Sequence, residues 1–278
     1  MTGTQALRLA VERLRNAGVE DAARDARILL AHSLGRPADR LTLHLTDPVP
    51  PEAAARFDAA LTARTRRQPV SQITGQRLFW GRSFRVTPDV LDPRPETEVL
   101  IATALEQPFR KILDLGTGSG CILLSCLADR PIAHGTGVDL SPSALAIAAD
   151  NADRLGLAAR AGFLLSDWCQ AVVDRYDLII SNPPYITAAE MPFLAPEVRL
   201  WEPAMALTPG GDGLDAYRII ARQSLARLLP GGRLMVEIGP TQAAEVSALF
   251  AAAGLDQIGI RRDLDGRDRV VLAVRPEN

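Results

Sequence analysis

The sequence predicts a doubly wound α/β domain that follows a small bundle of helices. Beyond residue 110, short apolar runs alternate with longer segments of helical periodicity, the pattern of parallel strands joined by helices on both faces of a sheet. The first 70 residues instead repeat apolar side chains at helical spacing, with short connections, as helical bundles do. Two apolar runs flank Asp265-Gly266 near the end of the chain, which predicts a closing hairpin with an antiparallel strand at one edge of the sheet.

The helical front part divides into segments at glycine and proline residues. Leu7, Val11 and Leu14 recur at helical spacing, which predicts that the first helix buries one face. The four expected segments end near Gly18, Gly35, Leu45 and Pro69. Residues 71–90 come next, and the alternation of bulky and polar side chains around Gly81 predicts a β-hairpin linker.

The α/β part is expected to occupy residues 91–278, and the helical part residues 1–70. The expected strands are 110–116, 134–140, 161–167, 176–181 and 232–239, with the hairpin over 256–274. The expected helices are 120–129, 142–156, 215–229 and 242–254.

Composition excludes several classes of protein. With 47% hydrophobic and 23% charged residues, and no apolar run of 18 residues, the chain is expected to be globular without a membrane span. Its charged amino terminus lacks the apolar core of a signal peptide. The three cysteines, Cys121, Cys126 and Cys169, form no C-x-x-C pair. We therefore expect no disulfide framework, no metal site and a reducing, cytoplasmic environment.

Charge is unevenly distributed along the chain. Residues 1–80 contain 12 arginines and 8 acidic residues, whereas the remaining 198 carry 19 basic and 25 acidic residues. The basic front part could meet an acidic or RNA-associated partner. Charge alone is equally well explained by a solvated, arginine-rich helical surface.

A glycine-rich loop, Asp114 to Gly120 in "DLGTGSG", follows the first strand of the predicted sheet. Glycines there allow the backbone to approach a ligand closely. A dinucleotide fingerprint beginning at Gly116 would need a third glycine at position 121, which is Cys121. A phosphate-binding Walker loop would need a following Gly-Lys-Ser/Thr, which is missing. The D-x-G-x-G-x-G form instead resembles motif I of class I methyltransferases, which bind S-adenosyl-L-methionine.

Side chains at the ends of the next two strands support this cofactor. Asp139 ends the second strand, where a carboxylate can accept both ribose hydroxyls. Asp167-Trp168 follows the third, where an aromatic face can hold adenine. Taken singly, Asp139 is equally well explained as an acid at a helix amino terminus, and Trp168 as core packing. Three such sites at successive strand ends favour the cofactor.

The fourth strand ends in Asn182, Pro183, Pro184 and Tyr185, which places this turn at the same edge of the sheet. An amide or aromatic amine nitrogen is a poor nucleophile because its lone pair is delocalised, and acceptors that bind its N–H groups out of plane favour a pyramidal transition state. The Asn182 side chain and the carbonyls of a stiff, donor-poor proline turn offer such acceptors, while Tyr185 can stack on a planar group. The alternative is a rigid turn that only ends a strand.

Several longer segments, "DARILLAHSLG", "PVSQITGQRLFWGRSFRVTPDVLDPRPETE", "EPAMALTPGGDGLDAYRII" and "RDLDGRDRVV", resemble the PrmC/HemK family. Its members methylate the glutamine of the Gly-Gly-Gln motif in class 1 peptide chain release factors. The resemblance implies a Rossmann-like class I methyltransferase fold with the last strand antiparallel. It also implies a release-factor-binding role for residues 1–70, a monomer, and S-adenosyl-L-homocysteine as the product.

The resemblance also implies roles for individual residues. The cofactor would contact Gly116, Thr117, Gly118, Ser119, Gly120, Asp139, Trp168 and Asn182. The substrate would contact Asn182, Pro183, Pro184 and Tyr185, with Arg94 and Glu96 from the segment Pro93 to Glu98. Asn182, Pro183 and Tyr185 would be catalytic. Asp92 and Pro209 depart from the family pattern, which expects an apolar residue and a glycine there.

Two other functions compete with this interpretation. A DNA adenine N6-methyltransferase shares the N-P-P-Y turn, but it would need a basic DNA-binding surface, and residues 81–278 are net acidic. We therefore expect no direct DNA binding. A non-catalytic adaptor that binds a translation factor would not need an intact glycine loop, Asp139 and N-P-P-Y turn.

Overall fold

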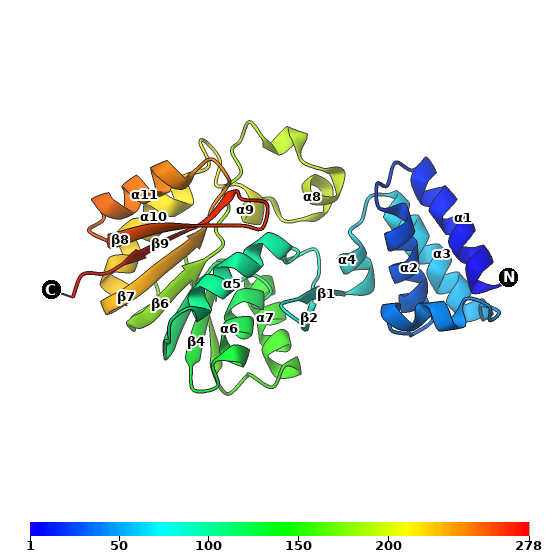
Figure 1. Ribbon diagram of the computed structural model, residues 1–278, viewed down its shortest axis with the longest axis horizontal. Helices are drawn as coiled ribbons and strands as arrows, with labels where there is room; N and C mark the ends of the chain where they lie inside the picture. Colours follow the sequence, from blue (N-terminus) through cyan, green and yellow to red (C-terminus); the bar gives the residue numbers. More distant parts are fainter. Residues whose placement is uncertain (278) are drawn as a thin grey trace. The chain divides into compact units, whose positions relative to one another are not determined.

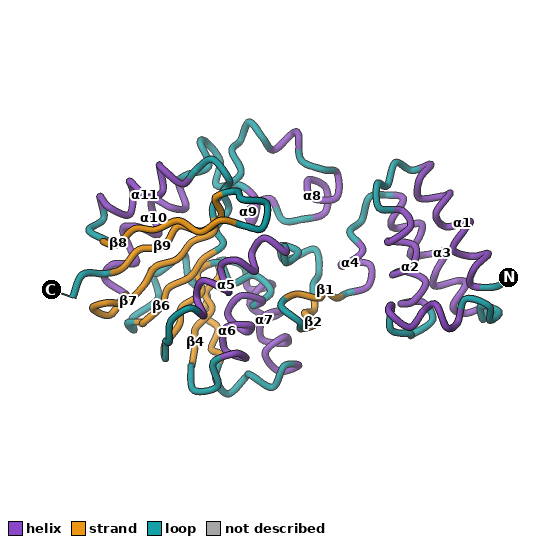
Figure 2. Tube along the Cα trace, viewed as in Figure 1, coloured by secondary structure: helices purple, strands orange, loops and turns teal. Residues whose placement is uncertain are grey.

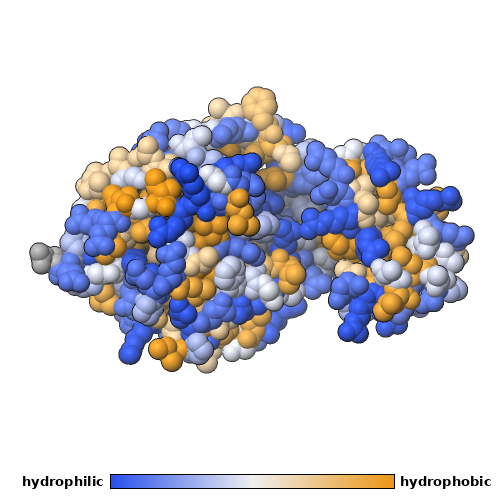
Figure 3. Space-filling view, viewed as in Figure 1, coloured by the Kyte–Doolittle hydropathy of each residue, from blue (hydrophilic) through white to orange (hydrophobic). Residues whose placement is uncertain are grey.

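The computed structural model describes residues 1–277, which form two compact units (Figure 1, Figure 2). The first unit contains residues 1–76 together with 195–201, and the second contains residues 77–194 and the chain from Glu202 onward. None of the described helices is long and apolar enough to cross a membrane. On the face drawn in Figure 3, hydrophobic residues are interspersed among hydrophilic ones, as on an ordinary globular surface.

The first unit is a helical bundle. Its helices are α1 (Gly3–Asn16), α2 (Ala22–Ser33), η1 (Ala38–His44), α3 (Pro51–Thr65), α4 (Val70–Thr74) and α8 (Pro196–Trp201). Thr2 and Gln5 form a reciprocal capping box at the start of α1. Leu14, Leu29 and Leu41 are fully buried in its core. The helical front part predicted from apolar spacing is therefore present.

Helix α8 comes from late in the chain and is bound to the bundle by charge. Glu197 accepts from Arg64 at 2.9 Å and from Arg67 at 2.9 Å, and Arg64 also pairs with the buried Asp25 at 2.7 Å. Trp201 Nε1 donates to the carbonyl of Arg66. Sequence periodicity did not predict this helix, because six residues are too few to show a period.

The predicted hairpin consists of β1 (Gln76–Phe79) and β2 (Arg82–Arg85). Its two-residue turn has positive φ at both Trp80 (48°) and Gly81 (69°), as a type I′ turn requires. Trp80 Nε1 donates to Asp129 at 2.7 Å, and Arg82 pairs with the same carboxylate at 2.5 Å. These bonds attach the hairpin to the end of α6 (Cys121–Asp129) in the second unit.

The second unit is built on a seven-stranded sheet of order β5-β4-β3-β6-β7-β9-β8. The strands are β3 (Lys111–Leu115), β4 (His134–Asp139), β5 (Ala161–Leu165), β6 (Tyr176–Ser181), β7 (Leu228–Glu237), β8 (Asp256–Arg262) and β9 (Asp268–Val274). Strands β3 to β7 are parallel, and β9 is antiparallel to both β7 and β8. The last strand is antiparallel, as the resemblance implied.

The prediction that the antiparallel strand lies at the edge is wrong. The edge strand is β8, and β9 returns between β7 and β8. The hairpin pattern in the sequence fixes the pairing of these two strands, but it does not say which of them pairs with β7. Strand β9 is the more apolar, with Val270, Val271 and Ala273 buried, whereas β8 is mostly exposed or partly exposed. The more apolar strand therefore takes the interior position.

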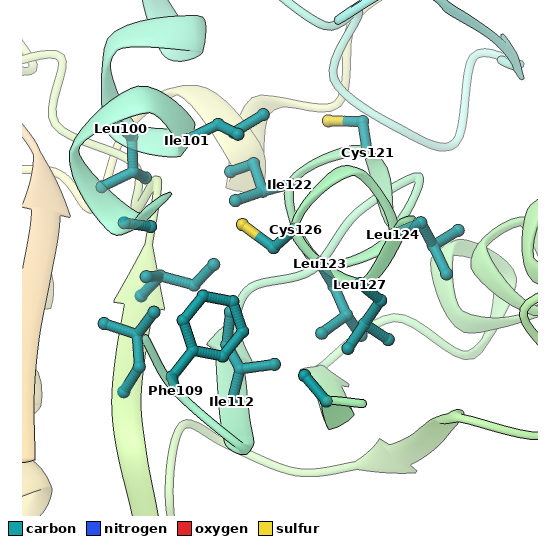
Figure 4. Close-up of a cluster of buried hydrophobic side chains, with 14 of the residues drawn as sticks. Leu100, Ile101, Phe109, Ile112, Cys121, Ile122, Leu123, Leu124, Cys126 and Leu127 are labelled. Atoms are coloured by element: carbon teal, nitrogen blue, oxygen red, sulfur yellow. The ribbon is translucent and has the colours of Figure 1, made fainter. Parts of the chain in front are cut away.

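Alternate residues of the strands pack into two cores. Ile112, Leu178, Ile180 and Val270 face α5 (Glu98–Leu105), α6 and α7 (Pro142–Arg154), and Figure 4 shows part of this cluster. The neighbouring residues Leu113, Ile179, Val236 and Val271 face α10 (Asp215–Ser224) and α11 (Ala243–Ala252) on the other side. Helices thus cover both faces, which confirms the doubly wound α/β prediction. The remaining short helices are η2 (Pro95–Thr97), η3 (Met191–Phe193), α9 (Ala204–Leu207) and η4 (Leu225–Arg227).

The strand order reverses between β3 and β6. The chain proceeds from β3 outward to β4 and β5 through helices on one face, and from β6 outward to β7 through α10 on the other. In such sheets ligands bind beyond the carboxyl ends of the strands at this reversal. Leu115 and Ser181 are paired in register, and the Ser181 hydroxyl donates to the Leu115 carbonyl at 2.7 Å. Gly116 and Asn182, the next residue of each strand, therefore enter the same crevice.

Candidate active site

A cavity of about 360 Å³ opens at the carboxyl ends of β3 to β6, and every residue that lines it belongs to the second unit. Its size is in the range of small-molecule sites. Of the residues predicted from sequence to bind cofactor or substrate, the cavity walls include Arg94, Gly116, Thr117, Gly118, Ser119, Asp139, Trp168, Asn182 and Pro184. Gly120, Glu96, Pro183 and Tyr185 are not among the residues that line it.

The glycine loop is folded back onto the sheet. The amides of Gly116 and Thr117 both donate to the Val138 carbonyl at 2.9 Å, and the Thr117 hydroxyl donates to the buried Asp114 at 2.7 Å. Gly118 has φ +54° with no atom within 4 Å of where a Cβ would be, so its backbone is open to the cavity. The buried hydroxyl of Ser119 has no hydrogen-bond partner of ordinary length within residues 1–277.

Gly120 has a packing role instead. Its φ is +78°, and a Cβ there would lie 3.1 Å from Leu124 Cδ1 and 3.2 Å from Ala148 Cβ. The residue precedes α6 and allows that helix to approach α7 closely. Its contribution to a ligand would therefore be indirect.

Asp139 connects the glycine loop to the next helix. One carboxylate oxygen accepts from the Gly118 amide and the other from the Ser141 amide, both at 2.9 Å. Ser141 in turn caps α7 by accepting from the Ala144 amide. Each carboxylate oxygen has lone-pair capacity left for a ligand, and the loop is held in place by charge-assisted bonds.

Trp168 enters the cavity from a strained turn. Its φ is +50°, unusual for a bulky residue. Ser166 stabilises this backbone, because its hydroxyl donates to the Trp168 carbonyl at 2.7 Å and accepts from the Ala171 amide at 3.0 Å. The indole ring is also near the glycine loop, with Cζ3 4.0 Å from where a Cβ of Gly116 would be.

In the Asn182–Tyr185 turn, side chains differ in where they face. The Asn182 amide nitrogen donates to the Thr97 hydroxyl at 3.2 Å, and among residues 1–277 no donor bonds to its Oδ1. Pro183 is buried. The Tyr185 hydroxyl donates to Glu237 at 3.3 Å, and burial raises the pKa of this phenol. The tyrosine therefore remains neutral.

Comparisons with known proteins give the family. Residues 5–75 match the family described as PrmC N-terminal domain, and residues 91–226 match the methyltransferase small domain. A release factor glutamine methyltransferase of Cereibacter sphaeroides is 63% identical over 276 residues, 99% of each chain. The corresponding protein of Rhodospirillum rubrum is 48% identical over 95% of this chain and 82% of its own length. The chain belongs to the release factor glutamine methyltransferase family.

Solved structures share the fold of this methyltransferase at low sequence identity. A methyltransferase from Pyrococcus furiosus has a TM-score of 0.55 and 13% identity over 69% of this chain and 88% of its own. The human Mettl16 catalytic domain has a TM-score of 0.58 and 16% identity over 81% of this chain and 82% of its own. Together with the seven-stranded sheet, these likenesses confirm the predicted class I methyltransferase fold.

Arg94 lines the cavity but is already paired. Its guanidinium donates to both oxygens of Glu202, at 2.6 and 2.7 Å, and the Glu202 side chain is 1% exposed. This pair connects the segment before α5 to the segment Pro203–Pro209, and both segments contribute residues to the cavity wall. The structure thus gives Arg94 a partner within the protein that the sequence did not reveal.

The unusual Asp92 has a compensating partner. It is buried, with Arg77 Nη1 3.7 Å away, and Arg77 Nε donates to the Pro93 carbonyl. Replacing an apolar residue by a buried carboxylate is costly unless it is paired, and Arg77 supplies that pair. Pro209, the other departure, lies in the cavity wall.

Three buried carboxyl groups are hydrogen-bonded to residues of the candidate site: Asp114 to Thr117, Glu202 to Arg94 and Glu237 to Tyr185. Burial raises the pKa of Asp114 to about 7, that of Glu202 to about 7 and that of Glu237 to about 7. Burial also raises the pKa of the Cys121 thiol to about 12. Only a thiolate is a strong nucleophile. Cys121, which lies in the cavity wall, therefore stays protonated and does not act as a nucleophile.

Sequence reasoning missed Thr97, Leu140, Glu202 and Glu237. Leu140 lines the cavity although it is 58% exposed, and an apolar residue between Asp139 and a helix cap could have indicated it. Glu202 stands in "EPAMALTP", a segment quoted for the family resemblance. The sequence did not indicate a role for Thr97 or Glu237, because that role depends on residues that are near them only in the folded structure.

Proposed function

We propose that this chain transfers a methyl group from S-adenosyl-L-methionine to the side-chain amide nitrogen of a glutamine in class 1 peptide chain release factors. One observation carries the proposal: Asn182 follows β6 directly beside the glycine loop, with its amide nitrogen bonded inside the protein and its oxygen available. The relatives that are 63% and 48% identical are named for this activity.

The cavity residues fit the methyl donor. The open backbone at Gly118, the Ser119 hydroxyl, the Asp139 carboxylate and the Trp168 ring present hydrogen-bonding groups and an aromatic face around a cavity of about 360 Å³. These groups suit an amino acid part, a ribose and a flat base respectively. When bound, the cofactor supplies an electrophilic methyl group on a sulfonium.

The residues of the turn would act on the substrate amide. Asn182 Oδ1 would accept one N–H and the Pro183 carbonyl the other, which stabilises a nitrogen whose lone pair is released from amide resonance. Such preorganised dipoles favour the transition state over the ground state. Tyr185, fixed through its hydroxyl to Glu237, would limit the movement of the turn. The nitrogen loses its proton after attack, so this scheme needs no titratable base.

The helical bundle is proposed to bind the release factor. It corresponds to the domain described as PrmC N-terminal domain, and 1–80 has an excess of four basic charges. Positive charge can steer an acidic partner toward the enzyme. The domain limits proposed from the sequence, 1–70, 71–90 and 91–278, remain our proposal, as does a cytoplasmic location.

A labelling experiment tests this function. The purified chain is incubated with S-adenosyl-L-methionine carrying a labelled methyl group, and with a release factor, duplex DNA or neither. Label on the release factor supports the proposal. Label on DNA would support an adenine methyltransferase instead, and no transfer to either would support a non-catalytic adaptor.

A further inference from the structure

Thr97 ends η2 directly before α5, and its helical φ of −66° and ψ of −19° differ from the extended conformation in which a threonine caps a helix. Here the side chain makes no capping hydrogen bond. The residue is 2% exposed, and its hydroxyl instead accepts from Asn182 Nδ2 at 3.2 Å. The hydroxyl therefore contributes to the Asn182 turn rather than to its own helix.

The Asn182 amide can present either of two groups to a ligand. One end carries an acceptor oxygen and the other carries two donor hydrogens, and the two orientations occupy almost the same space. A substrate amide that must give up its N–H hydrogens requires the oxygen. Catalysis by Asn182 thus depends on something that holds the nitrogen end away from the substrate.

A hydroxyl could bond to either end of that amide, because it both donates and accepts. The Asn182 nitrogen, which can only donate, is the end that contacts the Thr97 oxygen, and Glu237 offers an acceptor for the Thr97 hydrogen. Glu237 is 1% exposed. Its Oε1 accepts from the Tyr185 hydroxyl, and its Oε2 has no partner of ordinary hydrogen-bond length among the described residues. The Thr97 side chain lowers the pKa of this carboxyl against the effect of burial, so the two side chains are neighbours.

When Glu237 is ionised, its Oε2 is a buried acceptor without a partner of ordinary length, which is unfavourable, so the freely rotating Thr97 hydrogen turns toward it. The lone pairs of the Thr97 oxygen are then left for the Asn182 nitrogen, in agreement with the observed contact. With its nitrogen end occupied, the amide has only its oxygen to offer the cavity.

We infer that Thr97 is a positioning residue, which together with Glu237 fixes the orientation of the Asn182 amide so that its oxygen faces the substrate. The order of donation is from Asn182 to Thr97 and from Thr97 to Glu237. The catalytic consequence rests on the proposed function, whereas the orientation itself does not.

The kinetic test compares Thr97→Val, which keeps the shape and removes the hydroxyl, with Thr97→Ser, which keeps the hydroxyl. We expect Thr97→Val to lower kcat about three- to tenfold, which is the effect expected from the loss of one hydrogen bond. Its affinity for S-adenosyl-L-methionine should be unchanged. Thr97→Ser should retain wild-type kcat within about twofold. If both variants lost kcat equally, the hydroxyl would not be the cause and the inference would be overturned.

A double-mutant cycle separates positioning from a general structural effect. Thr97→Val is combined with Asn182→Ala, and since Thr97 acts through Asn182, adding Thr97→Val to the Asn182→Ala variant should cause no further loss of kcat. A full additional three- to tenfold loss in the Asn182→Ala background would contradict the inference. Thermal unfolding of each variant confirms that the protein remains folded.

The orientation is tested without any substrate by NMR of side-chain amides in protein labelled with ¹⁵N-asparagine. The Asn182 NH₂ signal should be protected from exchange with water in wild type and Thr97→Ser, and unprotected in Thr97→Val. Equal protection in all three would overturn the inference. If the wild type transferred no methyl group to a release factor while this pattern held, the proposed function would fail and the orientation would stand.

Discussion

Asn182 is the residue on which the proposed chemistry depends most. It follows a buried strand, lies beside the glycine loop, and has one end of its amide bonded to Thr97. A rigid acceptor in this position costs no reorganisation when charge develops on the substrate nitrogen.

Removal of the Asn182 side-chain oxygen should slow methyl transfer strongly. We expect Asn182→Ala to lower kcat with release factor by on the order of 10²- to 10³-fold, as the loss of one preorganised transition-state dipole does elsewhere. Affinity for S-adenosyl-L-methionine, measured by calorimetry, should change far less. An unchanged kcat would show that Asn182 has no role in the chemical step.

Asp139 allows a separate prediction about the cofactor. In Asp139→Asn the amides of Gly118 and Ser141 both lose a charged acceptor, and one of them faces the NH₂ end of the new side chain, so the glycine loop loosens and one ligand bond is lost. Hydrogen bonds to charged groups imply that the Kd for S-adenosyl-L-methionine rises about 10- to 100-fold. The exposed Asp153→Asn on α7 is the matched control and should leave Kd unchanged. Equal Kd values for Asp139→Asn and the control would refute the assigned role.

For single residues, the sequence predicted which of them lie at the ends of strands better than it predicted which side chains they contact. Gly116, Asp139, Trp168 and Asn182 each end a strand, and the carboxyl ends of neighbouring parallel strands meet, so their gathering around one cavity followed from the pattern. The partner of Arg94 could not be predicted, because Glu202 is 108 residues away along the chain. The inward tilt of Tyr185 toward Glu237 depends in the same way on a distant strand.

Among the elements, the Asn182–Tyr185 turn is fixed by the loop before α10. A Cβ on Gly213, whose φ is +77°, would lie 2.4 Å from the Tyr185 carbonyl oxygen. That oxygen also accepts from Gln242 Nε2 at 3.0 Å. Any side chain at position 213 must therefore displace the turn or the loop.

We expect Gly213→Ala to lower kcat by up to on the order of 10²-fold, since a misplacement of about 1 Å is enough for such a loss. Binding of S-adenosyl-L-methionine should be retained, because Gly213 is not among the residues that line the cavity. Gly211→Ala is the control: its φ is +51°, but no atom lies within 4 Å of the new Cβ. Equal kcat values for Gly213→Ala and Gly211→Ala would contradict the role of Gly213 in fixing the turn.

The elements themselves followed from the sequence where their periodicity was long enough. Strands β3 to β7 and helices α6, α7, α10 and α11 lie where apolar runs and helical spacing predicted them. Helix α5 was not expected, because "EVLIATAL" is apolar almost all round and shows little amphipathic contrast. The hairpin of β8 and β9 was predicted. Which of the two strands pairs with β7 was not, because it depends on which strand is the more buried.

On the scale of the whole molecule, stability should depend on pH through three buried carboxyls in the second unit. Asp114, Glu202 and Glu237 have ordinary pKa values of 3.8, 4.5 and 4.5, and burial raises each pKa to about 7. Between these values the folded state binds more protons than the unfolded state. The free energy of unfolding therefore falls as pH rises through this window.

Chemical denaturation at pH 5 and pH 7 should show a lower free energy of unfolding at pH 7. Glu237→Gln cannot ionise, so this variant should show a smaller decrease than wild type. Exposed carboxyls with lowered pKa, such as Asp212, act below pH 4 and do not mask this change. A free energy of unfolding that rose from pH 5 to pH 7 would contradict the assignment of these groups as buried acids.

The most direct measurement of the central claim is the site of methylation. A class 1 release factor is incubated with the chain and S-adenosyl-L-methionine, digested, and sequenced by tandem mass spectrometry. The account predicts a single added methyl group on the side-chain amide of the glutamine in the Gly-Gly-Gln motif, greatly reduced with Asn182→Ala. A methyl group on another residue, or undiminished methylation by Asn182→Ala, would contradict it.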